Sequence, residues 1–114
     1  MKAIELRRPW DISCIDVPMP VPSEGEALIR ISAAGICGSD IGAYRGTNGL
    51  VTYPRIIGHE LAGTVVSIPS GNRNGIMLGD RVVVDPYIYC GHCYPCSIGR
   101  TNCCTDLKVL GVHV

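Results

Sequence analysis

Four cysteines crowd into one short segment late in the sequence. Cys90, Cys93, Cys96 and Cys104 form the pattern C-x2-C-x2-C-x7-C. Such spacing lets one turn of backbone direct several sulfur atoms inward, and four thiolates complete a tetrahedral zinc site with no open position. A closed site of this kind is structural and fixes a loop that lacks its own apolar core. The spacing therefore predicts a structural zinc site, with ordinary buried or redox thiols as the weaker alternative.

Three residues around this motif carry separate expectations. Cys103 stands beside Cys104 and could replace it as the fourth ligand. His92 lies between two of the ligands, and we expect it to face solvent. Cys14 lies in an apolar segment, so we expect it to be a small residue of the core.

A second group of potential ligands is spread over residues 37–60. Cys37 and His59 each lie beside a glycine at the end of an apolar segment, which suits ligands held over a cleft. The pair alone is weak evidence, because a lone histidine is more often structural than metal-bound. Asp40 could accept one ring proton of His59 and leave the other nitrogen for a metal. With Glu60 as an additional ligand, these residues predict an open catalytic zinc site.

A small domain built mainly from strands must position both groups. The chain has 114 residues and no Phe, and it is rich in Val, Ile, Gly and Pro, which is typical of a β domain with functional loops. Ser39 and Asp40 are good helix-capping residues and predict a short helix that ends near Tyr44. Short apolar segments bounded by turn residues predict strands at residues 2–6, 12–17, 61–68 and 81–84, and the alternation of apolar residues predicts a further strand at residues 27–33.

Some of these segments carry more specific expectations. In residues 27–33 the apolar side chains alternate, which predicts a half-buried strand that delivers Cys37 to the end of a sheet. Gly63 is expected to interrupt a later strand, and residues 70–75 have the composition of a turn. Residues 87–104 have little apolar periodicity, so we expect a long loop that needs the zinc site to hold it.

Charge and hydropathy argue against several classes of protein. Lys plus Arg number 10, as do Asp plus Glu, and neither sign forms a run, so no nucleic acid or membrane partner is expected. No segment approaches the roughly 18 apolar residues of a membrane span, and residues 1–10 do not resemble a secretory signal. The odd number of cysteines, seven, argues against a disulfide scaffold. We therefore expect a cytoplasmic protein that acts on a small neutral molecule.

The chain closely resembles the zinc-containing medium-chain dehydrogenases. The signature G-H-E-x2-G and the four-cysteine loop carry most of the resemblance, and the segment Val109-Leu-Gly-Val-His113 is most similar to the branch that acts on polyols, threonine and sugar acids. This resemblance implies a mainly β, GroES-like, partly open β-barrel with short helices and a long zinc-binding loop. The matching stretches are Ala34-Gly-Ile-Cys-Gly-Ser-Asp40, Pro54-Arg-Ile-Ile-Gly-His-Glu-Leu-Ala-Gly63, Gly79-Asp-Arg-Val-Val-Val-Asp-Pro86 and Cys90 to Cys104.

The resemblance also implies the metal ligands. Cys37 and His59 correspond to ligands of the catalytic zinc. Glu60 corresponds to an acid beside the metal that coordinates it in some members, with a buried structural carboxylate as the alternative. Asp40 corresponds to the acid that orients the histidine. The ligands of the structural zinc correspond to Cys90, Cys93, Cys96 and Cys104.

Three further assignments depend on the same resemblance. Ser39 corresponds to the hydroxyl that relays the substrate proton toward solvent, with a simple helix cap as the alternative. Tyr44 falls where polyol-acting members often place a residue of the substrate pocket, with plain packing as the alternative. The family pattern favours Cys104 over Cys103 as the fourth structural ligand.

The implied activity is transfer of hydride between a secondary alcohol, polyol or sugar acid and NAD or NADP, in a full-length homo-oligomer, dimeric or tetrameric. Residues 1–114 are expected to be a truncated catalytic domain, with the structural-zinc loop at 87–104. The remaining catalytic-zinc ligand and the G-x-G-x-x-G motif of a Rossmann domain are missing from this sequence. We expect this fragment alone to be inactive. The alternatives are a non-catalytic, zinc-stabilised GroES-like binding module and, against the even charge balance, a zinc-ribbon nucleic-acid binder.

Overall fold

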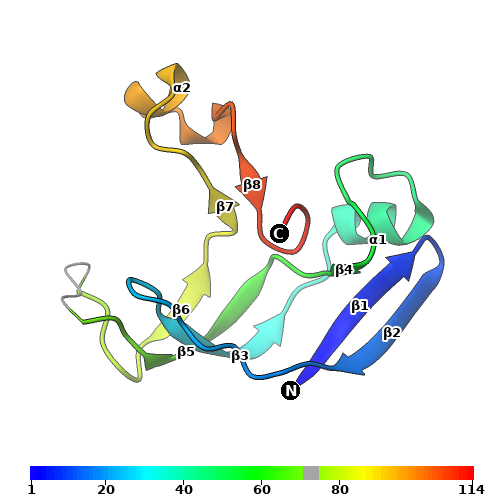
Figure 1. Ribbon diagram of the computed structural model, residues 1–114, viewed down its shortest axis with the longest axis horizontal. Coiled ribbons are helices and arrows are strands. Elements are labelled where there is room, and N and C mark those ends of the chain that lie inside the picture. Colours follow the sequence, from blue (N-terminus) through cyan, green and yellow to red (C-terminus); the bar gives the residue numbers. More distant parts are fainter. Residues whose placement is uncertain (71–74) are drawn as a thin grey trace.

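Strands dominate the regular structure of the chain (Figure 1). The computed structural model describes residues 1–70 and 75–114. Within these residues the strands form two three-stranded sheets and one two-stranded ribbon, and short helices connect them. The fold class is therefore mainly β, as predicted. No helix among the described residues is long and apolar enough to span a membrane.

The first sheet contains an N-terminal hairpin that is fixed to a helix. The hairpin turns at Trp10, which has a positive φ of 66° and donates its backbone N–H to Tyr44 O at 2.7 Å. The two aromatic rings meet edge to face with centroids 5.0 Å apart, so the hairpin and the helix hold a fixed relation. The strand order is β2-β1-β4, and the elements are β1 (Lys2–Arg8), β2 (Asp11–Asp16), β4 (Arg55–Ile56) and α1 (Gly38–Arg45).

The helix α1 agrees with the predicted short helix. It ends at Gly46, whose φ of 74° lies in the left-handed region that favours glycine. Beneath it lies a small apolar core in which Leu6 is completely buried. The core consists of Leu6, Ala43, Val51 and Val112. Since Val112 follows the cysteine loop in the sequence, this core joins distant parts of the chain.

The second sheet has the order β3-β5-β6, all antiparallel, with β5 in the centre. The prediction that Gly63 interrupts β5 is wrong, because the strand runs through it without a break. Gly63 instead admits the neighbouring backbone: a Cβ there would overlap Arg30 O and lie 2.8 Å from Ile29 Cγ2. The pairing of β3 with β5 is irregular at two places, between Leu28 and Ile29 and between Ile31 and Ala33, and neither breaks β5. The bounds are β3 (Leu28–Ala34), β5 (Leu61–Ser67) and β6 (Arg81–Val84).

Two predictions about burial are wrong. Cys14 is exposed, not in the core. The register of the hairpin places it opposite Ile4, on the same face as the buried Leu6, but the core covers this face only around Leu6, and Ile4 is itself 45% exposed. The sequence predicted that the apolar face of β3 is half-buried. In the second half of the strand this face is accessible to solvent, since Ile31 is 45% exposed and Ala33 is also exposed. β3 is an edge strand, so it has a neighbour on one side only. The predicted turn at 70–75 falls mostly on residues outside the described part of the chain.

The cysteine segment forms a lobe at the end of the ribbon (Figure 1). The ribbon pairs Tyr87 with Val109 and Ile88 with Lys108, so both ends of the predicted loop are tied together. The loop is less irregular than its sequence indicates, since it contains two short helical turns. Its elements are β7 (Tyr87–Ile88), α2 (Tyr94–Ser97), η1 (Thr101–Cys103) and β8 (Lys108–Val109).

The chain is more open than a compact domain of its length. Its radius of gyration is 15.5 Å, whereas about 13 Å is expected for a compact chain of this size. Many large apolar side chains are therefore accessible, and an apolar cavity of about 510 Å³ opens between the hairpin and α1.

Candidate functional site

Asp40 joins two candidate ligands of the predicted open site. Its side chain is almost completely buried, and its Oδ2 atom accepts a hydrogen bond from the Cys37 backbone N–H at 2.8 Å. Its other oxygen, Oδ1, lies 3.4 Å from His59 Nδ1. A carboxylate in the first turn also interacts favourably with the positive end of the helix dipole. One side chain thus caps α1, fixes the cysteine backbone and faces the histidine ring.

His59 is placed so that one ring nitrogen stays available. Its Nδ1 atom is buried and, among the described residues, makes no hydrogen bond, but it faces the Asp40 carboxylate. A proton on Nδ1 leaves a free lone pair on Nε2. Nε2 lies 3.4 Å from Ser39 Oγ. The structure therefore brings the predicted histidine, acid and hydroxyl together.

The Cys37 thiol is activated for ionisation. Hydrogen bonds from the side chain and backbone of Ser39, and then from His59, hold the pKa of Cys37 below its ordinary value of 9.0. Burial and the negative charge of Glu60 act in the opposite direction and are outweighed. The sulfur also lies at the N-terminus of α1, where a helix dipole favours a thiolate. Cys37 is thus biased toward the charged form that binds metal ions.

Three side chains in this region can hold one metal ion. Ligand atoms of Cys37, His59 and Glu60 all lie within 4.8 Å of one another. Sulfur, imidazole nitrogen and carboxylate oxygen are all zinc ligands, and three protein ligands leave a fourth position open. The donor set and its spacing therefore fit an open zinc site.

The backbone before His59 is fixed by a contact with the far end of the sequence. Gly58 has a φ of 115° and Gly111 a φ of 73°, which both favour glycine. The two backbones are so close that a Cβ on Gly111 would overlap Gly58 O and lie 2.8 Å from its carbonyl carbon. Nearby, His113 Nδ1 accepts a hydrogen bond from Val109 N–H at 3.1 Å. The turn that follows the cysteine lobe therefore packs directly against the residue preceding His59.

The four cysteines of the lobe have the spacing of a zinc-thiolate cluster. Zn–S bonds of about 2.3 Å at tetrahedral angles place sulfur atoms about 3.8 Å apart. The Cys93 sulfur lies 3.4 Å from that of Cys96 and 3.9 Å from that of Cys104, and Cys90 and Cys96 are 4.0 Å apart. Cys103 is exposed and lies outside this group. These sulfur atoms fit a tetrahedral zinc ion, and the geometry favours Cys104 as the fourth ligand.

Ionisation within the cluster is uneven. The backbone N–H of Thr105, assisted by that of Cys96, lowers the pKa of Cys93 to about 6. Burial and the neighbouring Cys93 thiol raise the pKa of Cys96 to about 12. One thiolate is thus stable at neutral pH, while further negative charge in the cluster is costly without a cation. Filling the site must therefore displace protons. His92 is exposed, as predicted, and its Nδ1 lies 2.9 Å from Cys90 O.

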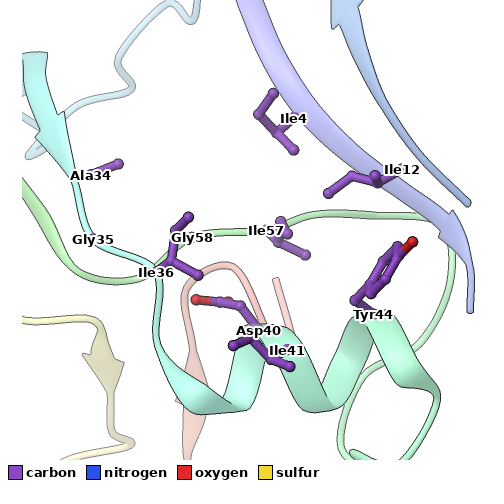
Figure 2. A pocket seen from close by; sticks show the side chains of 10 residues that line it. All are labelled: Ile4, Ile12, Ala34, Gly35, Ile36, Asp40, Ile41, Tyr44, Ile57 and Gly58. Atoms are coloured by element: carbon purple, nitrogen blue, oxygen red, sulfur yellow. The ribbon is translucent and has the colours of Figure 1, made fainter. Parts of the chain in front are cut away.

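The apolar cavity flanks the open site. Figure 2 shows Ile4 and Ile12 of the hairpin on one side and Ile41 and Tyr44 of α1 on the other, with Asp40 among them. Tyr44 lies in this cavity and also packs against the core. The geometry is compatible with a pocket residue and with plain packing, the two roles that the sequence left open.

A comparison with models of protein families shows to which family the chain belongs. Residues 23–112 match the model of the alcohol dehydrogenase GroES-like domain. The chain belongs to this family. The match covers both ligand groups, so the open site and the cysteine lobe are parts of one GroES-like domain. The predicted resemblance and the GroES-like fold class are confirmed.

Individual relatives agree with this assignment. An uncharacterized zinc-type alcohol dehydrogenase-like protein of Haemophilus influenzae is 59% identical over 100% of this chain. L-galactonate-5-dehydrogenase of Escherichia coli is 39% identical over 99% of it. The crystal structure of the alcohol dehydrogenase rspB from Escherichia coli CFT073 with NADH has a TM-score of 0.89 and 49% identity, and it covers the whole chain. The GroES-like chain spans only 33% of the length of each of these proteins.

Sequence reasoning missed the glycines that bring the parts of this GroES-like domain together. Gly35 lies against Glu60, and Gly111 lies against Gly58. Both glycines lie in segments that the family resemblance singled out, Gly35 close to Cys37 and Gly111 close to His113, but no role was predicted for the glycines themselves. The available signal was a glycine next to a candidate ligand, which indicates close approach of another backbone or side chain. Pattern alone could not name the partner.

Proposed function

We propose that the chain is the zinc-binding catalytic domain of an oxidoreductase that transfers hydride between an alcohol and a nicotinamide cofactor. The observation that carries this proposal is the group of Cys37, His59 and Glu60 ligand atoms within 4.8 Å of one another. Asp40 orients two of these residues: it accepts a hydrogen bond from the Cys37 backbone N–H at 2.8 Å, and it lies 3.4 Å from His59 Nδ1. The GroES-like family of alcohol dehydrogenases supports the reaction class.

Cys37 and His59 are the proposed ligands of a catalytic zinc ion, and Glu60 is a third, exchangeable ligand. Zinc bound there supplies a Lewis acid that lowers the pKa of a substrate hydroxyl. The exposed Glu60 side chain has room to leave the group, which would open a further position for substrate. Asp40 keeps the proton of His59 on Nδ1, so that Nε2 remains a donor to the metal.

Ser39 is the proposed first acceptor of the substrate proton. Its hydroxyl lies 3.4 Å from Nε2, the ring nitrogen of His59 that is the proposed metal ligand. A hydroxyl can accept one proton while it donates another, so it can pass the proton on without holding a charge. Ser39 is half-buried, so its side chain remains partly accessible to solvent.

Cys90, Cys93, Cys96 and Cys104 are the proposed ligands of a structural zinc ion. Their four sulfur atoms leave no open position, so this ion would hold the lobe in place and take no part in the reaction. This division of labour makes residues 1–114 one catalytic domain with a stabilising lobe at residues 87–104.

The proposed substrates are secondary alcohols, polyols or sugar acids, with NAD or NADP as the hydride acceptor. The relative named L-galactonate-5-dehydrogenase supports the sugar-acid class, and the rspB structure with NADH supports a nicotinamide cofactor. In this proposal the protein supplies position and electrostatic field, while the cofactor supplies the hydride chemistry. The chain spans a third of these relatives, so both assignments concern the whole protein.

We also propose a cytoplasmic, homo-oligomeric protein, dimeric or tetrameric. A reducing compartment keeps thiol ligands available to zinc, and all seven cysteines are free in the structure. Size-exclusion chromatography with light scattering measures the assembly, and a monomer at micromolar concentration would contradict this part of the proposal.

The test of the function is the variant Cys37→Ala. It removes the ionised ligand of the open site and leaves the cysteine lobe untouched. In the whole protein, we expect the rate of alcohol oxidation with NAD or NADP to fall about a thousandfold, since metal catalysis contributes several kcal/mol. Elemental analysis should still find one zinc ion per chain, held by the lobe.

The matched control is Cys14→Ala, which removes an exposed cysteine of β2 that belongs to neither candidate ligand group. This variant should keep wild-type turnover and metal content. Unchanged turnover in Cys37→Ala would overturn the proposed role of Cys37, whereas a wild-type protein that binds zinc but oxidises no alcohol would favour a non-catalytic, zinc-stabilised binding module.

A further inference from the structure

Gly35 connects the end of β3 with the residue that follows His59. Its backbone N–H donates a hydrogen bond to Glu60 O at 2.7 Å, next to the strand pair Ala34–Leu61. The two residues are thus held opposite each other by the end of the β3–β5 ladder. A larger residue in place of Gly35 would therefore press against Glu60.

The space around Gly35 is occupied by the Glu60 side chain. A Cβ built on Gly35 would overlap Glu60 Oε2 and lie 3.0 Å from Glu60 Cβ and 3.3 Å from Cδ. The φ of Gly35 lies outside the left-handed region, so the backbone does not require glycine here. Glycine is needed at this position for its missing side chain, and the volume that it frees is filled by the carboxylate.

Glu60 has another direction in which to move. Its side chain is exposed, and it lines a second hollow, of about 400 Å³, on the other side of Gly35 from the apolar cavity. Gly35 borders both hollows and appears next to Gly58 in Figure 2. A larger residue at position 35 would therefore displace the flexible carboxylate into open space, and the 3.0 Å contact with Glu60 Cβ would require only a small shift of the facing backbone.

We propose that Gly35 is a positioning residue that selects the inward conformation of Glu60. The absent side chain admits the carboxylate to the group formed with Cys37 and His59, whose ligand atoms lie within 4.8 Å. This inference rests on the proposed function, because it assumes that Glu60 contributes to metal binding there. In this proposal Gly35 is not a metal ligand itself, but it determines whether Glu60 can reach the metal as the third ligand.

The test is a double-mutant cycle between Gly35→Ala and Glu60→Ala. The readout is the affinity for zinc of the open site, measured by competition with a coloured chelator in protein whose cysteine lobe is already filled. We expect each single variant to weaken this affinity by about 10- to 100-fold, the usual effect of losing a group that supports a metal site. The double variant should bind zinc as weakly as Glu60→Ala alone.

Gly49→Ala is the matched control. Gly49 also has a φ outside the left-handed region, and a Cβ there would meet no atom within 4 Å. This substitution should leave the zinc affinity of the open site unchanged. It separates the effect of displacing Glu60 from the general effect of replacing a glycine by alanine.

The outcomes distinguish this inference from the proposed function. If Glu60→Ala weakens zinc binding but Gly35→Ala does not, or if the two effects add, the role of Gly35 is wrong and the proposed function stands. If the wild-type protein binds no zinc at the open site, the proposed function fails. A crystal structure of the Gly35→Ala variant then decides the positioning role, because a Glu60 carboxylate in its original place would overturn it.

Discussion

The cysteine lobe and the open site obtain metal-binding geometry in different ways. In the lobe all four candidate ligands come from residues 90–104, and two short helical turns place the sulfur atoms. In the open site the candidate ligands Cys37 and His59 come from separate connecting segments, and Asp40 and the Gly58–Gly111 contact hold them together. Local spacing is enough for a closed structural site, whereas an open site depends on long-range packing. The two sites should therefore respond differently to perturbation.

The largest expected effect is the loss of the lobe on removal of Cys104. Cys104 is buried within the cluster, whereas Cys103 is its exposed neighbour. Cys104→Ala should lower the unfolding temperature by roughly 10 °C or more, because structural zinc contributes directly to folding. Cys103→Ala should change it by no more than about 2 °C. Differential scanning calorimetry measures both, and equal shifts in the two variants would show that the lobe has no fixed fourth ligand.

Mild chelation should separate the two sites by their kinetics. The open site has an exposed ligand and an accessible position, whereas the cysteine cluster encloses its metal. We expect the protein to lose one zinc ion per chain at least about ten times faster than the other. Elemental analysis during dialysis against a chelator follows the loss. Simultaneous loss of both ions would contradict the contrast between an open and a closed site.

Asp40→Asn should weaken the open site directly, while the lobe keeps its full set of four cysteines. The amide keeps the volume of the side chain but has one accepting oxygen, which cannot serve both the Cys37 N–H and the His59 ring. We expect a loss of about 10- to 100-fold in zinc affinity at the open site. The control Asp16→Asn removes an exposed carboxylate that pairs with Lys2 on the surface. A wild-type affinity in Asp40→Asn would show that packing alone orients the two ligands.

The smallest expected effect concerns the ionisation of Cys37 in the metal-free protein. Ser39 is the main cause of the lowered pKa, so thiolate should form at a lower pH than in an unstructured cysteine peptide. Alkylation of Cys37, followed by mass spectrometry as the pH rises, should reach half its maximal rate below pH 9.0. Ser39→Ala should move this midpoint upward. A midpoint that does not change would remove Ser39 as a donor to the sulfur.

Short-range features of the domain could be predicted from the sequence. Ser39 and Asp40 predicted a short helix here, although the N-cap residue is Cys37 and Asp40 occupies the N3 position. The cysteine spacing predicted the lobe, because both features depend on neighbours in the chain. The pattern of apolar residues also predicted strands, but it could not show which face of a strand would pack against the rest of the domain. Cys14 and Ile31 were expected to be buried and are exposed, since burial depends on what packs against a strand.

The open site was predictable only in part for the same reason. Its ligands could be nominated from Cys37, His59 and Glu60 together with a family resemblance, whereas their mutual distances depend on tertiary contacts. A sequence pattern cannot predict the roles of Gly35 and Gly111, because a side chain at either position would collide with a residue that is distant in the sequence. The apolar cavity was also missed, since its walls come from the hairpin and from α1, which are separate in the sequence.

The contact between Gly58 and Gly111 links the two metal sites thermodynamically. The cysteine lobe lies in the sequence between these two glycines, and the ribbon that carries it ends at Val109, just before the contact. A zinc ion in the lobe shortens the free chain that must be ordered to bring Gly111 onto Gly58, which reduces the entropy lost on closure. Binding in the lobe therefore favours the backbone conformation that presents His59. By reciprocity, an ion on His59 must strengthen binding in the lobe.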